Sequence, residues 1–162
     1  MNELTIETRF KIYDWDELCD EDRQLANAAI EATHRSYAPY SLFSVGAAAR
    51  LANGIIVTGT NQENAAYPSG LCAERTSLFY ANSQYPDQAV TTLAIAARPS
   101  DSPTLSENIC PPCGACRQVL LETEQRFATP MQVILYCEDG CYVFESAKDL
   151  LPLSFAANNL IG

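Results

Sequence analysis

Two separated cysteine clusters constrain this chain more than any other feature of its sequence. Cys72 stands at the head of the segment Cys72–Asn82, and Cys113 and Cys116 lie at the start of Gly114–Phe127. Both segments carry apolar residues at helical spacing, so each cluster marks a point where a loop becomes a helix. A helix N-terminus has free N–H groups and a partial positive charge, which lower the pKa of a thiol. A fold that joins the two helix starts would bring three thiolates to one ion.

The type and number of these ligands indicate a catalytic zinc site. Zinc binds thiolates tetrahedrally, and three protein ligands leave one position open for water. Water in that position loses a proton near neutral pH. Glu74 follows Cys72 by two residues, so its carboxylate can take that proton and pass it to a substrate nitrogen. Arg75, and with it Arg117, can offset the negative charge of the sulfurs through hydrogen bonds.

Two other interpretations of the cysteines remain. Cys110 precedes Cys113 by three residues and, with the other three thiols, would close a four-sulfur structural zinc site. The protein would then be a binding or assembly module, although the two prolines after Cys110 favour an extended path that carries it away. A redox pair of Cys113 and Cys116 is the second interpretation, and it leaves Cys72 and Glu74 without a role.

Helical and strand patterns alternate along the chain, which predicts an α/β domain around one sheet. The helix that begins at Asp22 is expected to reach Tyr37 and to end before Pro39. We expect an N-terminal extension over residues 1–20 and one domain over residues 21–162. The expected strands, with hairpins at Asn53-Gly54 and Asp139-Gly140, are Leu42–Leu51, Ile55–Gly59, Val90–Ala97, Met131–Cys137 and Cys141–Phe144.

The charge balance and the single histidine narrow the possible functions. The formal net charge is −10, from 10 Lys plus Arg against 20 Asp plus Glu, so the chain lacks the basic surface that polymeric nucleic acid requires. His34 is the only histidine, which excludes a metal site that needs two histidines from one chain. No apolar run approaches the roughly 20 residues of a membrane span. The charged N-terminus is unlike a signal peptide, so we expect a cytoplasmic protein that acts on a small solute.

Four segments of the chain resemble the small homotetrameric cytidine deaminases, and the resemblance runs from about Tyr37 to Phe155. The two cysteine motifs match the zinc motifs of that family, a three-ligand site with a Glu that is the known signature of zinc-dependent base deaminases. The other two match its N-terminal signature and its ribose-binding loop. The segments are Cys72–Arg75, Pro112–Arg117, Tyr37–Ala48 and Asn61–Tyr67.

The resemblance implies a fold, a reaction and an assembly. The fold is a three-layer α-β-α domain around one mixed sheet of about five strands. The reaction is the hydrolytic deamination of cytidine and deoxycytidine to uridine and deoxyuridine, a step of pyrimidine salvage. The assembly is a homotetramer with one zinc ion per subunit and active sites completed by a neighbouring subunit.

The resemblance also assigns a role to each matching residue. The three cysteines of the two motifs would bind zinc, and Glu74 would transfer protons, beside the role of Arg75 already inferred from its position. In the substrate site, Phe43 would stack on the pyrimidine, Asn61 and Glu63 would bind the ribose 3′-hydroxyl, and the backbone around Ala73 would hold the base. The residues that would complete the site of a neighbouring subunit are Ala65, Tyr67 and Phe155.

Overall fold

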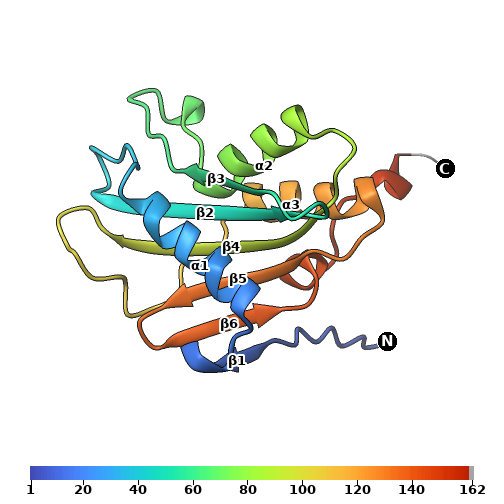
Figure 1. Cartoon of the computed structure of the whole chain (residues 1–162). Helices are drawn as coiled ribbons and strands as arrows, with labels where there is room; N and C mark the ends of the chain where they lie inside the picture. The colour runs from blue at the N-terminus through green and yellow to red at the C-terminus, as the bar shows by residue number, and fades with distance from the viewer. Residues whose placement is uncertain (161–162) are drawn as a thin grey trace.

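The apolar runs of the sequence form one mixed sheet in a computed structural model, which describes residues 1–160 (Figure 1). The strand order is β1-β6-β5-β4-β2-β3. The central neighbours β4 and β5 are parallel, and the other neighbouring pairs are antiparallel. The strands are β1 (Lys11–Tyr13), β2 (Phe43–Leu51), β3 (Ile56–Thr60), β4 (Val90–Pro99), β5 (Gln132–Cys137) and β6 (Gly140–Phe144).

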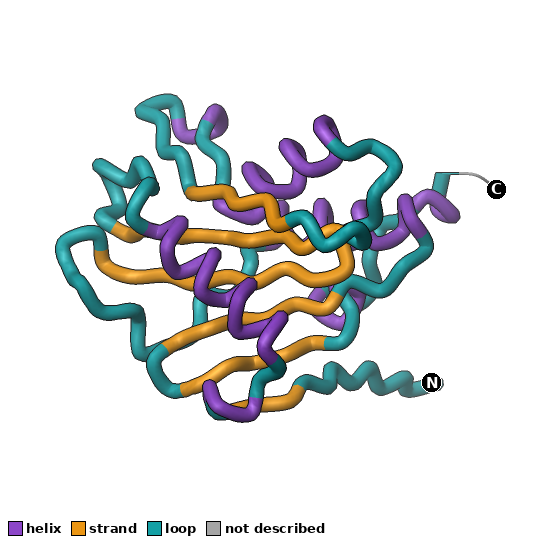
Figure 2. Tube along the Cα trace, viewed as in Figure 1, coloured by secondary structure: helices purple, strands orange, loops and turns teal. Residues whose placement is uncertain are grey.

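Helices cover both faces of this sheet, as Figure 2 shows, with α1 on one face and α2 and α3 on the other. None of the described helices is long and apolar enough to cross a membrane. The prediction of a three-layer α-β-α domain is confirmed. The helices are α1 (Asp20–Thr33), α2 (Ala73–Gln84) and α3 (Gly114–Phe127), and short 3-10 turns form η1 (Trp15–Glu17), η2 (Tyr67–Ser69), η3 (Ala147–Leu150) and η4 (Ala157–Asn159).

The central strand β4 shows how the sequence builds two cores. Successive side chains of a strand point to opposite faces of the sheet. Leu93 and Ile95 belong to the core under α2 and α3, whereas Ala94 and Ala96 face Leu25 and its neighbours in α1. Alanine at these positions leaves room for α1 to lie close to the sheet.

Most element bounds agree with the sequence-based prediction to within two residues, and two features differ by more. The helix expected to reach Tyr37 ends at Thr33, because the backbone N–H of Tyr37 donates instead to the Asn61 carbonyl at 3.1 Å. Within residues 1–20, which were expected to form an extension, Lys11–Tyr13 pair with β6 as strand β1. Three residues are too few for the alternation of polar and apolar side chains to indicate a strand. The division into an extension and a domain stays a prediction.

The direction of the strands places the starts of α2 and α3 on the same side of the molecule. Both β3 and β4 are antiparallel to β2, so β3 and β4 run in the same direction. Each leads through a loop into a helix, and both helices therefore begin near the same edge of the sheet. Gly59 allows β3 to approach α2 closely, since a Cβ at this position would lie 2.6 Å from the carbonyl oxygen of Ala73.

Candidate active site

The two cysteine clusters meet where α2 and α3 begin. Cys72 is the N-cap of α2, Cys113 is the N-cap of α3, and Cys116 lies in the first turn of α3. The Cys72 Sγ lies 3.8 Å from the Cys113 Sγ, which lies 3.5 Å from the Cys116 Sγ. All three sulfur atoms are within 4.8 Å of one another. The structure thus brings together the three thiols that the sequence selected, in a group that suits a zinc ion.

The protonation of these thiols shows that the donor set fits a cation. The pKa of Cys72 falls to about 5, chiefly because the Cys116 thiol donates a hydrogen bond to it and also because of hydrogen bonds from Arg75 and Cys113. The proton shared with Cys72, together with burial, raises the pKa of Cys116. One thiolate is therefore favoured beside neighbouring thiols, and such a donor set would suit a zinc ion, which binds thiolates.

Glu74 is a buried carboxyl in the first turn of α2. Its side chain is 5% exposed, and it follows the ligand Cys72 by two residues. Burial raises the pKa of the Glu74 carboxyl, and the negative charge of Cys72 adds to the rise. A general acid–base works best when its pKa lies near the working pH, and the rise of the Glu74 pKa is in that direction. This position and this pKa direction suit a residue that transfers protons.

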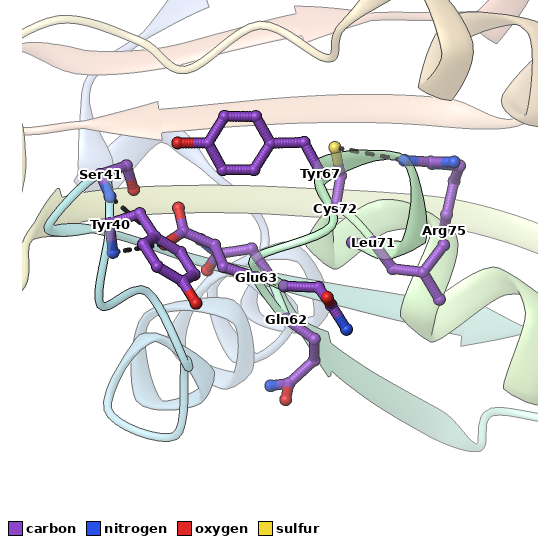
Figure 3. Close-up of a pocket in the computed structure, with 11 residues that line it drawn as sticks. Tyr40, Ser41, Gln62, Glu63, Tyr67, Leu71, Cys72 and Arg75 are labelled. Carbon is purple, nitrogen blue, oxygen red and sulfur yellow. Dashed lines mark hydrogen bonds between the residues drawn. The ribbon is translucent and has the colours of Figure 1, made fainter.

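The two arginines that follow the cysteine motifs make different contacts. Arg75 Nη2 lies 3.7 Å from the Cys72 Sγ, as the dashed line in Figure 3 marks. Arg117 makes its hydrogen bonds to two backbone carbonyls, those of Pro112 and Leu150. Compensation of the sulfur charge through hydrogen bonds therefore falls to Arg75, and the expectation that Arg117 shares this contact is wrong.

Cys110 lies outside the group of clustered sulfurs. Among the residues that the structure describes, the group consists of Cys72, Cys113 and Cys116. Cys110 instead packs partly buried against the core under α2 and α3. Burial, together with the nearby negative charge of Glu74, raises the pKa of its thiol to about 11, so Cys110 is neutral at physiological pH. The geometry gives no support to a four-sulfur structural site.

A cavity of about 450 Å³ opens beside Cys72 and Arg75. Glu63 and Tyr67 line it together with Tyr40, and Figure 3 shows these side chains around the same hollow. The cavity is large enough for a small heterocyclic ligand. Polar groups and two tyrosine rings thus stand in the cavity that Cys72 borders.

Glu63 is held as a carboxylate at the wall of this cavity. Its Oε2 atom accepts hydrogen bonds from the backbone N–H groups of Tyr40 at 2.8 Å and Ser41 at 3.2 Å (Figure 3). A hydrogen bond from the Ser41 side chain, followed by these backbone bonds, lowers the pKa of Glu63. The other carboxylate oxygen can accept a hydrogen bond from a ligand.

Asn61 lies at the same wall and has a fixed orientation. Its Oδ1 accepts from the Val45 N–H at 2.8 Å and from the Ser36 hydroxyl, and its Nδ2 donates to the Phe43 carbonyl at 2.8 Å. A flipped amide would place its NH2 group against the Val45 N–H and its oxygen against the Phe43 carbonyl. Asn61 and Glu63 both line the cavity, and an amide N–H together with a carboxylate oxygen is complementary to a hydroxyl group.

Other residues that the resemblance selected lie elsewhere. Phe43 borders a separate hollow with Pro99 and Ile109. Ala73 is fully buried at the start of α2, Ala65 is exposed, and Phe155 is 58% exposed in the C-terminal segment. The structure of one chain therefore does not bring Phe43, Ala65 or Phe155 to the cavity wall.

The contacts that orient Asn61 and Glu63 cannot be predicted from the spacing of residues in the sequence. Ser36 and the backbone of Tyr40 and Ser41 lie more than twenty residues before the side chains they bind. The Tyr-Ala-Pro-Tyr-Ser motif marks this region through the family resemblance, but the role of its backbone N–H groups becomes visible only in the fold.

The fold and the site define a class of protein. A zinc ion on three thiolates retains a position for water, and a buried carboxyl beside it provides a proton acceptor. The protein is of the class of zinc-dependent hydrolases.

Comparison with known proteins identifies the family within this class. The cytidine and deoxycytidylate deaminase zinc-binding region matches residues 19–129. The cytidine deaminase of Halalkalibacterium halodurans is 37% identical over 142 residues, 86% of this chain and 98% of that protein. That of Sporosarcina psychrophila is 42% identical over 131 residues, 80% of this chain and 88% of that protein. The crystal structure of cytidine deaminase from Burkholderia pseudomallei gives a TM-score of 0.70 at 37% identity, and the match covers 82% of this chain and 97% of that one. The chain belongs to the cytidine deaminase family.

Proposed function

We propose that this protein removes the 4-amino group of cytidine and deoxycytidine by hydrolysis and releases uridine or deoxyuridine and ammonia. The observation that carries the proposal is the buried Glu74 carboxyl beside three clustered cysteines, next to a cavity that offers a hydroxyl-binding pair. The cytidine deaminase relatives support the choice of substrate.

The three cysteines would hold the zinc ion, and each other residue has a separate task in the reaction. When bound, zinc supplies a Lewis acid that makes water a nucleophile near neutral pH. Glu74 accepts a proton from the attacking water and delivers it to N3 of the pyrimidine. Glu74 then transfers the second proton of the water to the 4-amino group, which leaves as ammonia while the water oxygen becomes the carbonyl oxygen at C4. Asn61 and Glu63 bind the ribose 3′-hydroxyl and hold the base in register.

The direct test is to add cytidine to the purified protein and to follow the change in ultraviolet absorbance as uridine forms. A sample treated with a chelator and a chelated sample reloaded with zinc are the controls. Conversion that the chelator abolishes and zinc restores would support the proposal. Absence of conversion of both cytidine and deoxycytidine by zinc-loaded protein would overturn it.

Replacement of Glu63 by Gln is expected to raise the KM for cytidine and to leave kcat nearly unchanged. The carboxylate accepts a hydrogen bond from the ribose hydroxyl in the ground state and in the transition state alike. Loss of an interaction that is equal in both states raises KM and leaves kcat unchanged. A hydrogen bond to a charged group contributes about 1.5–3 kcal/mol, so kcat/KM should fall by roughly 10- to 100-fold. Steady-state kinetics measure this change.

Glu122→Gln is the matched control for this substitution, because Glu122 is an exposed carboxylate on α3. Its KM should equal that of the unmodified protein. An unchanged KM in Glu63→Gln would show that Glu63 does not bind the ribose. The assignment of the reaction would not be affected.

We further propose that the protein acts as a homotetramer in which Ala65, Tyr67 and Phe155 reach the active site of a neighbouring subunit. Tyr67 is 76% exposed and Phe155 is 58% exposed, so both rings are available to a second chain. Phe43 would stack on the base in this assembled site. Light scattering measures the mass in solution, and a monomer with full activity would contradict the proposal. The cytoplasmic location stays a prediction.

A further inference from the structure

The segment that leads into Cys113 has few groups that can hold it in place. Pro111 and Pro112 have no backbone N–H, so only their carbonyls can form backbone hydrogen bonds. In the part of the chain that the structure describes, the backbone of residues 107–112 makes one hydrogen bond, which the Pro112 carbonyl accepts from Arg117 Nε at 2.8 Å. Ile109 and Cys110 pack against the core under α2 and α3, and Arg117 provides the hydrogen bond that holds the backbone just before Cys113.

Arg117 joins this segment to a part of the chain that is anchored in the core. Its Nη1 atom donates to the carbonyl of Leu150 at 2.9 Å. Leu150 ends η3 and is 5% exposed within the core under α2 and α3. A guanidinium with a fixed planar fork can hold two carbonyls at once, and its charge strengthens both bonds. The Pro112 carbonyl is therefore held against a rigid point of the structure.

The same turn of α3 is attached to the C-terminal segment by its next residue. Gln118 Nε2 donates to the Phe155 carbonyl at 2.9 Å. The backbone N–H of Arg117 also donates to the Cys113 carbonyl at 2.9 Å, which closes the first turn of the helix. The turn that carries Cys113 and Cys116 is thus connected to residues 150–155 by two consecutive side chains.

We infer that Arg117 is a positioning residue of the zinc site, which keeps the Cys113 thiolate in place by fixing the Pro112 carbonyl to the C-terminal part of the chain. The inference rests on the proposed zinc site and is independent of which nucleoside is the substrate. Within residues 1–160, the guanidinium of Arg117 donates its hydrogen bonds to the Pro112 and Leu150 carbonyls and not to a sulfur, so its effect on the metal passes through the backbone that enters α3.

The test compares zinc release from the full-length, zinc-loaded protein and its Arg117→Ala and Arg117→Lys variants. Transfer of zinc to an excess of a coloured chelator gives the release rate without reference to activity. Loss of a residue that orients a metal ligand costs about 10- to 100-fold in metal affinity, and we expect release from Arg117→Ala to be faster by about this factor. Arg117→Lys should lie between the two, because one ammonium cannot bridge both carbonyls.

Arg126→Ala is the matched control. Arg126 lies in the last turn of the same helix, and its Nη2 atom also donates to a proline carbonyl, that of Pro86 at 3.1 Å. This bond is at the end of α3 remote from the cysteines, so Arg126→Ala should release zinc at the rate of the unmodified protein.

Cobalt substitution separates a positioning role from a general loss of stability. Bands from thiolate-to-cobalt charge transfer report the geometry of the sulfurs, and they should change in Arg117→Ala at a temperature where the protein is fully folded. They should not change in Arg126→Ala. Equal release rates and equal spectra in the unmodified protein and the Arg117 variants would overturn the inference, and Arg117→Lys decides it if Arg117→Ala does not fold. An unmodified protein that binds no zinc would instead contradict the proposed function.

Discussion

Replacement of Glu74 by Gln is expected to leave the zinc in place and to lower kcat by about 10²- to 10⁴-fold, the range that a general acid–base contributes. Glutamine has nearly the same shape, so it fits the position of a side chain that is 5% exposed. An amide cannot accept a proton from water, nor return one to the substrate. Steady-state kinetics with cytidine measure kcat, and atomic absorption measures zinc.

The zinc content of the Glu74→Gln protein distinguishes a role in proton transfer from a role in holding the metal. A Glu74→Gln protein that keeps one zinc per chain and loses turnover assigns the proton transfer to this carboxyl. A variant that loses both would show only that Glu74 supports the metal site. A kcat within about tenfold of the unmodified value would contradict the role, because proton transfer contributes more than that.

Replacement of Cys113 by Ser is expected to release most of the zinc and to lower kcat/KM by more than about 10³-fold, since water without the metal is a poor nucleophile at neutral pH. A neutral hydroxyl is a weak ligand for zinc compared with a thiolate. The Cys113 Sγ lies 3.8 Å from the Cys72 Sγ and 3.5 Å from the Cys116 Sγ, so its loss would leave two thiols of the three-sulfur group. Zinc content and turnover are measured on the same sample.

Cys110→Ser is the matched control, because Cys110 precedes Cys113 by three residues and its thiol is neutral. It should keep its zinc and its turnover. Loss of zinc from Cys110→Ser would restore the interpretation of a structural four-sulfur site, whereas loss from Cys113→Ser alone would exclude it.

The parts of the fold that were predictable from sequence rest on local chemistry. The helix predicted over Gly114–Phe127 has those bounds in the structure, because its apolar face has a helical period and the backbone turns left-handed at Ala128. The Asn53-Gly54 hairpin was predictable because its turn needs a positive φ, and Gly54 has φ of 84°. The three zinc-binding candidates were predictable because thiols at two helix starts favour a metal.

The parts that were not predictable depend on contacts between distant segments. Tyr37 leaves α1 to bond with Asn61, which no helical pattern shows. The orientation of Glu63 depends on backbone N–H groups. Nearly every residue type has such a group, so the residue types alone do not predict this contact. Arg117 stands next to a ligand in the sequence, yet the fold directs it to carbonyls that only the tertiary structure brings near.

The short strand β1 has a consequence for the behaviour of the protein at high concentration. The edge of a sheet exposes unpaired N–H and C=O groups, and the edge strand of another molecule can add to them and begin a fibrous aggregate. Without β1, the edge strand on this side of the sheet would be β6, which has five residues. With β1 in place, the edge strand has three residues. Lys11 places a positive charge there, paired with Glu145 at 2.6 Å, and charges on an edge strand oppose such addition. The N-terminal residues thereby make this edge of the sheet a poorer template for the strand of another molecule, an effect that is separate from catalysis.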